Sequence, residues 1–105
     1  MESVFEIRFS TSMNTDEMFT VLRVGKLPFE WSMRESEYDG DYIKGMTADH
    51  IKVRVIDRSK DEAKGRFAFE VYFPSLGGEL ADKRKIDFLD LVRKTVFPLI
   101  KAKEL

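Results

Sequence analysis

The sequence predicts an α+β fold in which an antiparallel sheet of about five strands is covered on one face by two helices. Three observations lead to this prediction. Several segments alternate apolar and polar residues with the period of a strand, and two others repeat apolar residues with the period of a helix. An Asp-Gly pair at 39–40 is typical of a tight hairpin turn. The elements run β-α-β-β-β-β-α, an order in which helices cover one face of an antiparallel sheet.

The N-terminal part of the chain is predicted to form a strand and then a helix. Residues 4–9 alternate apolar and polar side chains, with the three aromatic and aliphatic residues on one face. Asn14 and Glu17 have the spacing of a capping box, and apolar residues follow at helical spacing. A helix is therefore expected over about residues 15–24, with Gly25 placed to end it.

A hairpin is predicted around the Asp-Gly pair. Taking Asp39 and Gly40 as the central residues of a type I′ turn fixes the register of the two flanking strands. The facing pairs are then Tyr38 with Asp41, Glu37 with Tyr42, Glu35 with Lys44, and Met33 with Met46. This register places the acids at the tip and four apolar residues on the core: Phe29, Trp31, Met33 and Met46.

Two more strands and a C-terminal helix complete the predicted fold. Residues 51–58 and 66–73 have the strongest strand patterns in the chain, with apolar side chains alternating toward the core. The last quarter of the chain then repeats apolar residues at helical spacing. Pro98 removes one helical hydrogen bond, so either a kink or a stop is expected at about Phe97.

Length and composition indicate one domain, residues 1–105, in a reducing compartment. The chain is 43% hydrophobic and 35% charged, which is ordinary for a folded domain. It has no cysteine, which excludes a disulfide scaffold, a thiolate metal site and a cysteine nucleophile. The first residues lack the pattern of a signal peptide, and no apolar run approaches the ~20 residues of a membrane span. A cytoplasmic protein without a membrane partner is expected.

The sequence contains no motif that indicates catalysis or a cofactor. His50 is the only histidine, and Asp49 beside it would point to the opposite face of a strand. The run Asp39-Gly40-Asp41 lacks the spacing of an EF-hand loop, and no phosphate-binding or serine-hydrolase motif occurs. We therefore expect no catalytic residue, no metal and no cofactor. A small carboxylate-dependent enzyme stays open as an alternative, because none of the 19 acidic residues is singled out.

The stretch EWSMRESEYDGDY, residues 30–42, is the strongest candidate for a binding surface. It contains five carboxylates, one tryptophan and two tyrosines in a chain whose net charge is only −1. Acids steer a basic partner to the surface, and tyrosine supplies rigid contact area. A solvated hairpin end would have the same composition. The candidate partner-binding residues are Glu35, Glu37, Tyr38, Asp39, Asp41 and Tyr42.

The small size of the chain, the distribution of its charges and the absence of a catalytic motif favour a non-enzymatic protein-binding module. Its most concrete form is an inhibitor or immunity-type protein, in which the acidic hairpin occludes the basic active site of a partner such as a nuclease toxin. This interpretation is an analogy at the level of size and charge and does not rest on a sequence motif.

Two other interactions are considered. Single-stranded nucleic acid could bind an outward sheet face through four residues: Lys52, Arg54, Arg66 and Tyr72. This alternative is less favoured, because Glu70 is expected on the same face and no RNA-binding motif occurs. A homodimer is also possible, in which the strands at 51–58 and 66–73 pair edge to edge between two copies.

Overall fold

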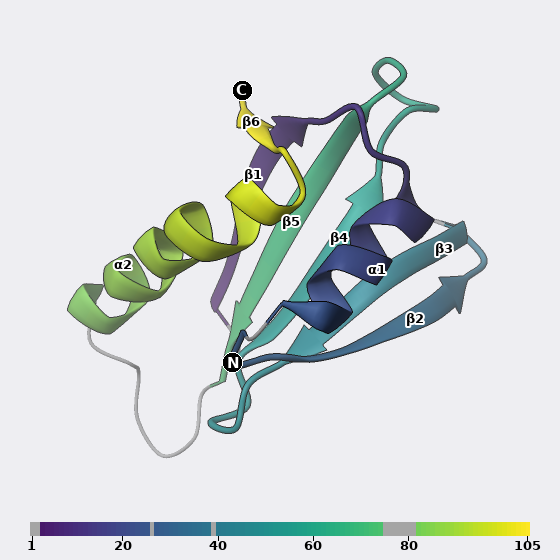
Figure 1. The fold of residues 1–105 in the computed structure, drawn as a ribbon. Helices are drawn as coiled ribbons and strands as arrows, with labels where there is room; N and C mark the ends of the chain where they lie inside the picture. Colours follow the sequence, from purple (N-terminus) through teal and green to yellow (C-terminus); the bar gives the residue numbers. More distant parts are fainter. Residues whose placement is uncertain (1–2, 26, 39, 75–81) are drawn as a thin grey trace.

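The chain forms a six-stranded antiparallel sheet covered on one face by helices, as described by a computed structural model for residues 3–25, 27–38, 40–74 and 82–105 (Figure 1). The sheet order is β2-β3-β4-β5-β1-β6. This confirms the α+β class and the predicted element order, and adds one short strand to the five expected. The strands are β1 (Ser3–Ser10), β2 (Glu30–Ser36), β3 (Gly40–Met46), β4 (Lys52–Asp57), β5 (Arg66–Phe73) and β6 (Lys103–Glu104). The helical segments are α1 (Thr15–Val24), α2 (Asp82–Leu91), a π-helical turn η1 (Val92–Val96) and α3 (Phe97–Leu99).

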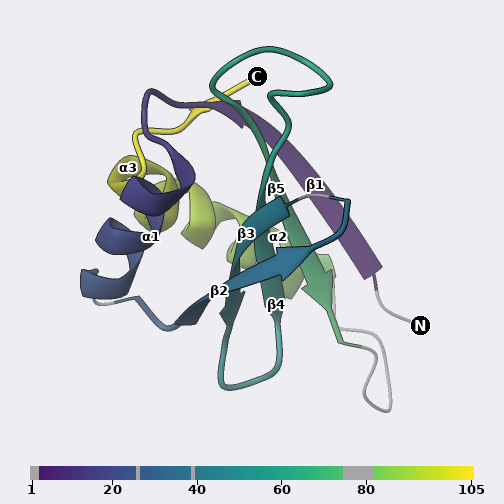
Figure 2. The same cartoon turned by 90° about the vertical axis from the view of Figure 1, so that its right-hand side faces the viewer.

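The core lies between the helices and one face of the sheet. Figure 2 shows the helices on one side of the sheet and none on the other. The apolar residues predicted to face inward on β4 and β5 are buried. The ring of Phe97 lies 5.5 Å from that of Phe9 and 5.6 Å from that of Phe69, measured between centroids. These contacts anchor the end of the C-terminal helix to the middle of the sheet.

Helix α1 begins with the predicted capping box. The Asn14 side chain accepts a hydrogen bond from the Glu17 backbone N–H at 2.8 Å, and the Glu17 carboxylate accepts one from the Asn14 N–H at 3.0 Å. These bonds satisfy two donors that would otherwise lack helical partners. At the other end, the Gly25 N–H donates to the Val21 carbonyl, so the helix ends where the sequence predicted.

The register predicted for the β2–β3 hairpin is wrong. Ser36 pairs with Gly40 and Glu35 with Asp41, so the connection has three residues and not two. Gly40 has φ of +65°, which is typical of the glycine that closes a three-residue hairpin loop. The four facing pairs expected from a type I′ turn do not form.

Packing of the only tryptophan explains the observed register. Trp31 faces Gly45, where a Cβ would lie 2.7 Å from the indole ring, so the ring fits only over a glycine. Because the observed register differs from the predicted one by an odd number of residues, β3 presents its other face to the core. Ile43 is therefore fully buried, whereas Met46 faces away from the helices opposite Glu30 and does not join the core.

The C-terminal helix continues through Pro98 and is distorted just before it. The Phe97 N–H donates to the Val92 carbonyl five residues earlier, and the five residues of η1 form a π-helical turn. Proline lacks an N–H, and its ring collides with the carbonyl four residues back, so the wider turn accommodates it. The helix therefore changes to π-type hydrogen bonding before the proline and continues to Leu99; it does not stop at Phe97.

The two strongest strands occupy the middle of the sheet. β4 pairs with β3 and β5, and β5 pairs with β4 and β1. Both edges of each strand are therefore already paired, and the predicted pairing of residues 51–58 or 66–73 between two copies is wrong. None of the helices in the described ranges is long and apolar enough to cross a membrane.

Candidate functional site

The tip of the β2–β3 hairpin is exposed and acidic. Glu35, Glu37 and Asp41 are exposed, and no ion pair joins any of the three to another described residue. The Tyr38 side chain is 92% exposed. Asp39, also a predicted partner-binding residue, lies outside the described residues. The tip therefore presents an aromatic ring among unpaired carboxylates.

Two of the tip acids face each other across the strands. Glu35 pairs with Asp41 in the β2–β3 register, so the two side chains lie on the same face of the hairpin. Like charges directly opposite each other destabilise a strand pair. The observed register therefore places a small electrostatic cost at the tip that the predicted register, with Glu35 facing Lys44, did not contain.

Tyr42 does not belong to the tip. Its ring is half-buried on the open face of the sheet, where the Arg54 guanidinium carbon lies 5.1 Å from the ring centroid. The structure thus brings together Glu35, Glu37, Tyr38 and Asp41 of the predicted partner-binding set, and it separates Tyr42 from them.

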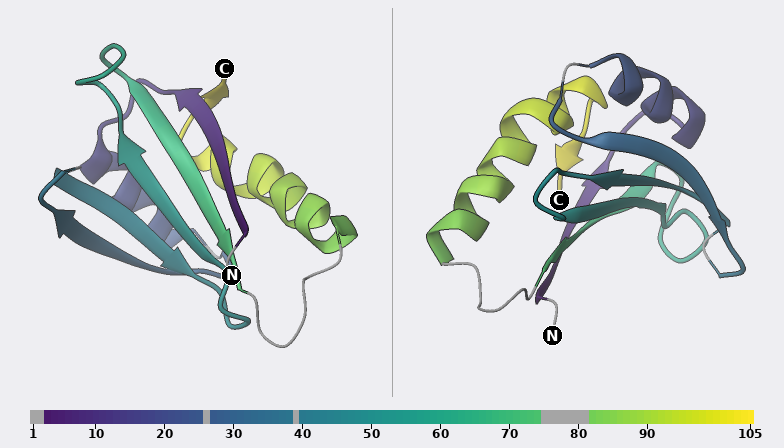
Figure 3. Two further views of the ribbon diagram at one scale, coloured as in Figure 1. Left: turned by 180° about the vertical axis from the view of Figure 1, so that it is seen from behind. Right: turned by 90° about the horizontal axis from the view of Figure 1, so that it is seen from below.

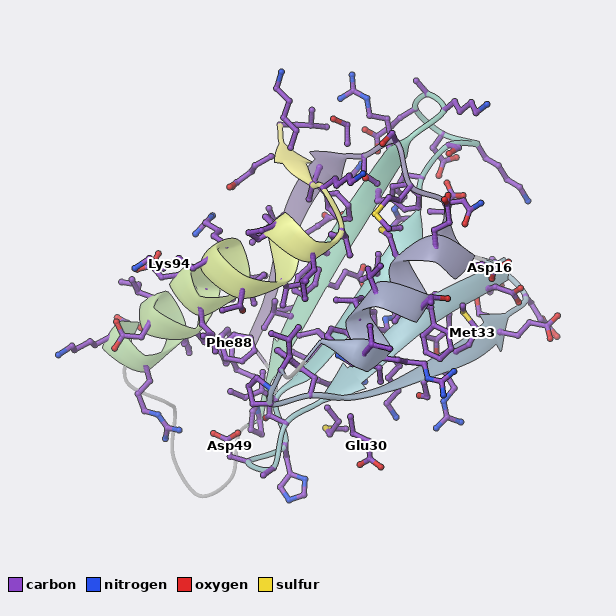
Figure 4. The ribbon with its side chains drawn as sticks, viewed as in Figure 1. Asp16, Glu30, Met33, Asp49, Phe88 and Lys94 are labelled. Carbon is purple, nitrogen blue, oxygen red and sulfur yellow. The ribbon has the colours of Figure 1, made fainter. Side chains whose placement is uncertain are left out.

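A cleft of about 490 Å³ lies beside the tip. It is bounded by Tyr38 and Asp41 of the hairpin, by the N-terminus of α1 and by the loop that follows β4. Figure 4 shows Asp16 at this end of the molecule and Asp49 at the other end of the sheet. Three further acids line the cleft, Asp16, Asp57 and Asp61, together with two cations, Arg58 and Lys60. We call the four tip residues and these three aspartates the acidic end.

Sequence reasoning missed the three aspartates of the acidic end. Asp16 stands in the first turn of α1, while Asp57 and Asp61 belong to the end of β4 and the loop after it. Asp16 precedes Glu35 by 19 positions, and Asp57 and Asp61 follow Asp41 by 16 and 20, so no local pattern marks them. Only the sheet order, which was not predicted, brings the three segments together.

The open face of the sheet carries a hydrogen-bonded network around Glu70. Arg54 donates to one Glu70 carboxylate oxygen from Nε at 3.0 Å and from Nη2 at 2.8 Å. The Tyr72 hydroxyl donates to the same oxygen at 2.6 Å, and Arg58 Nη2 lies 3.7 Å from the other. Burial alone would raise the pKa of Glu70, but the hydrogen bonds from Tyr72 and Arg54 hold it below its ordinary value.

Of the four residues predicted to bind single-stranded nucleic acid, three lie together and one does not. Lys52 Nζ lies 4.5 Å from the Tyr72 ring centroid and the Arg54 guanidinium carbon lies 5.4 Å from it, so these three side chains are together. Arg66 pairs with Ser10 at the far end of β5. The Tyr72 ring is already in contact with two cations, and Arg54 is already paired with Glu70. These groups therefore have partners within the sheet.

His50 and Asp49 do not form a catalytic pair. Asp49 accepts a hydrogen bond from the Thr47 hydroxyl at 2.6 Å and one from Arg84 at 3.0 Å. The Thr47 bond is the main reason why the pKa of Asp49 lies below its ordinary value. His50 is exposed, with φ of 66°, in the turn between β3 and β4. Within the described ranges, no group of three or more His, Cys, Asp or Glu residues is arranged to hold a metal ion.

Comparison with known proteins adds no assignment. No family model matches the sequence, and no match is found among curated proteins or solved structures. Function is therefore inferred from the geometry of the acidic end and of the open sheet face.

Proposed function

We propose that this chain is a non-enzymatic protein-binding module of the inhibitor or immunity type, acting in the cytoplasm, and that its acidic end binds a basic partner. The observation that carries the proposal is the 92% exposed Tyr38 among three carboxylates that form no ion pair with a described residue. An exposed tyrosine offers a large contact area at low entropic cost, and it becomes a binding hot spot when a partner covers it.

The tip acids differ from the five described carboxylates that are paired within the chain. Several carboxylates elsewhere are matched by arginines of the same chain: Glu6 and Glu62 by Arg8, Glu70 by Arg54, Asp49 by Arg84, and Glu104 by Arg93. Like Asp87 and Asp90 on α2, the tip acids have no ion pair with a described residue. The tip is distinguished because two of its acids, Glu35 and Asp41, also oppose each other across the strands. Local rules of stability are commonly violated at functional sites, because the binding partner supplies the missing interaction.

Charge and shape together define the expected partner. The acids attract a positively charged surface over roughly 10 Å at moderate ionic strength. The cleft beside Tyr38 offers room for a lysine or arginine side chain of that surface to approach Asp16, Asp41 and Asp57. A basic active-site surface, such as that of a nuclease, fits this description.

Charge reversal tests the proposal with a matched control. The tip variant carries Glu35→Lys, Glu37→Lys and Asp41→Lys. The control variant carries three reversals on the exposed side of α2, Asp82→Lys, Asp87→Lys and Asp90→Lys, so both variants change the net charge equally. Partners captured by immobilised wild-type protein are purified and titrated against all three proteins, and their enzymatic activity is assayed in the presence of each.

The expected result is binding and inhibition by wild type and control, and loss of both in the tip variant. Equal binding by wild type and the tip variant would rule out the acidic end as the interface. Equal loss in the tip and control variants would show that the captured protein responds to net charge alone. Inhibition of the partner, beyond binding, distinguishes the immunity type from other binding modules.

The two alternatives are less well supported by the geometry. Nucleic-acid binding would have to displace the cations that cover Tyr72 and compete with Glu70 for Arg54. A carboxylate-dependent enzyme would have to use the cleft of the acidic end, and the same charge-reversal variants would then abolish turnover of a small substrate.

A further inference from the structure

In the part of the chain that the structure describes, one sheet edge is only partly paired. β6 pairs with β1 only at Phe9 and Ser10, and the Leu105 N–H donates to the Arg8 carbonyl at 3.0 Å. Among the described residues, no strand pairs with residues 3–7 of β1 on this side. An open strand edge with this many backbone groups is a site for adding another strand.

The hydrogen bond to Arg8 shows which backbone groups point outward. In an antiparallel ladder, the N–H and C=O of one residue point to the same side, and successive residues alternate. Because the Arg8 carbonyl points toward β6, the same groups of Glu6 and Val4 also point away from β5. The free edge therefore offers two donors and two acceptors in the spacing of a strand.

Exposed apolar side chains surround this edge. Val4 is 54% exposed, and Phe5 is 39% exposed although its ring packs edge-on against Phe73. Ile86 of α2 is 57% exposed. It precedes Arg93 by two helical turns and so points to the same side, where Arg93 binds Glu104 of β6 at 2.9 Å. Figures 1 and 3 show α2 extending past β1 at this edge.

We propose that a second copy of this chain binds here, with the two β1 strands antiparallel about a two-fold axis at Phe5. The pairing joins Val4 of each copy to Glu6 of the other by backbone hydrogen bonds and continues one sheet through both subunits. Phe5 meets Phe5 of the second copy as a non-hydrogen-bonded pair, the closer of the two pair types, at roughly 4.5 Å between Cα atoms.

Coverage by β6 and the avoidance of opposed like charges favour this register. An axis at Ile7 would need the outward groups of Arg8, and Leu105 already occupies its carbonyl. An axis at Glu6 would place two glutamates directly opposite each other, which is unfavourable. With the axis at Phe5, each Glu6 faces Val4 of the second copy and keeps its own bond to Arg8 at 2.8 Å. Of these three axes, only the one at Phe5 uses outward backbone groups that are free among the described residues and keeps the two glutamates apart.

Three substitutions at Val4 test both the edge and the register. Val4→Pro removes an outward N–H and leaves the ladder to β5 intact, as proline does on an edge strand. Val4→Lys and Val4→Glu place opposite charges against Glu6 of the second copy in an otherwise matched pair of variants. Sedimentation velocity across a concentration series measures the dimer dissociation constant of each protein, and circular dichroism verifies folding.

The expected result is a reversible wild-type dimer that Val4→Pro converts to monomer. Since each dimer contains the Val4–Glu6 contact twice, Val4→Lys should tighten and Val4→Glu should weaken dimerisation, each by about 2- to 30-fold. A wild-type monomer at every concentration would overturn the proposal, as would a dimer that Val4→Pro leaves unchanged. Equal shifts in the lysine and glutamate variants would overturn the register even if Val4→Pro failed to fold.

The dimer proposal and the binding proposal can fail separately. The acidic end belongs to the β2–β3 side of the sheet, and the free edge belongs to β1 on the opposite side. Reversal of the tip acids should therefore leave the dissociation constant of the dimer unchanged.

Discussion

Gly45→Ala is the sharpest test of the hairpin register on which the acidic end is built. A Cβ at this position would lie 2.7 Å from a ring carbon of Trp31 and 2.8 Å from Val53 Cγ2, one on each neighbouring strand. Overpacking of this kind costs about 1–3 kcal/mol. Alanine recovers about 0.5–1 kcal/mol, because glycine loses more backbone freedom on folding. The difference is a net loss of about 0–2.5 kcal/mol in the free energy of unfolding, and the two close contacts place Gly45→Ala in the upper part of that range.

Thermal unfolding followed by circular dichroism measures this loss. For a domain of this size, each kcal/mol lowers Tm by roughly 4–8 °C. The same substitution is then made in a Trp31→Ala background, where the ring that collides with the new methyl group is absent. In that background only the 2.8 Å approach to Val53 Cγ2 remains, so the alanine at position 45 should cost less and the two substitutions should be non-additive.

Two results would refute the reasoning. Gly45→Ala could leave Tm unchanged or raise it, or it could destabilise both backgrounds equally. Either result would show that Trp31 does not cover Gly45. The pairing of Glu35 with Asp41 would then lose its structural basis, since the same register sets both contacts.

Three further predictions concern the helix cap, the partly buried carboxylate of Glu70 and the tip. Asn14→Ala should lower the free energy of unfolding by about 0.5–2 kcal/mol in chemical denaturation, and Asn14→Asp should retain most of it; equal stability of both would contradict the cap. The pKa of Glu70 is lowered by folding, so its stabilisation is present above the unfolded carboxyl pKa and is lost as pH falls through the folded value. Stability should therefore fall less steeply toward acid pH in Glu70→Gln than in wild type, and identical slopes would argue against the network. Asp41→Lys should raise stability by about 0.2–1 kcal/mol at low salt, because it places a cation opposite Glu35, while it weakens binding of a basic partner. A loss of stability would contradict the pairing.

The parts of the fold that the sequence predicts are those set by local pattern. The capping box of α1 and the alternation of β4 and β5 depend on neighbouring residues, and both are confirmed. The hairpin register was wrong because Asp39-Gly40 is a strong local signal for a two-residue turn. The contact between Trp31 and Gly45 joins residues 14 positions apart and outweighs it.

The acidic end was predicted only in part for a similar reason. The hairpin acids stand out as a cluster in the sequence, but Asp16, Asp57 and Asp61 join them through the sheet order and not through any run of residues. Arg54 is a second residue whose contacts depend on strand pairing. Its position on the outward face was predicted, but its pairing with Glu70 follows from the β4–β5 register, which alternation alone does not supply.

The position of β1 between β5 and β6 has a consequence for biosynthesis. Phe9 pairs with Phe67 on one side and with Glu104 on the other, whereas β2, β3, β4 and β5 each pair with the strand made just before or after them. Pairings between segments far apart in sequence form slowly, because a long loop must close first. The earliest strand of the six to leave the ribosome is therefore among the last to be secured. Its aromatic residues stay accessible to chaperones and to other nascent chains through most of translation.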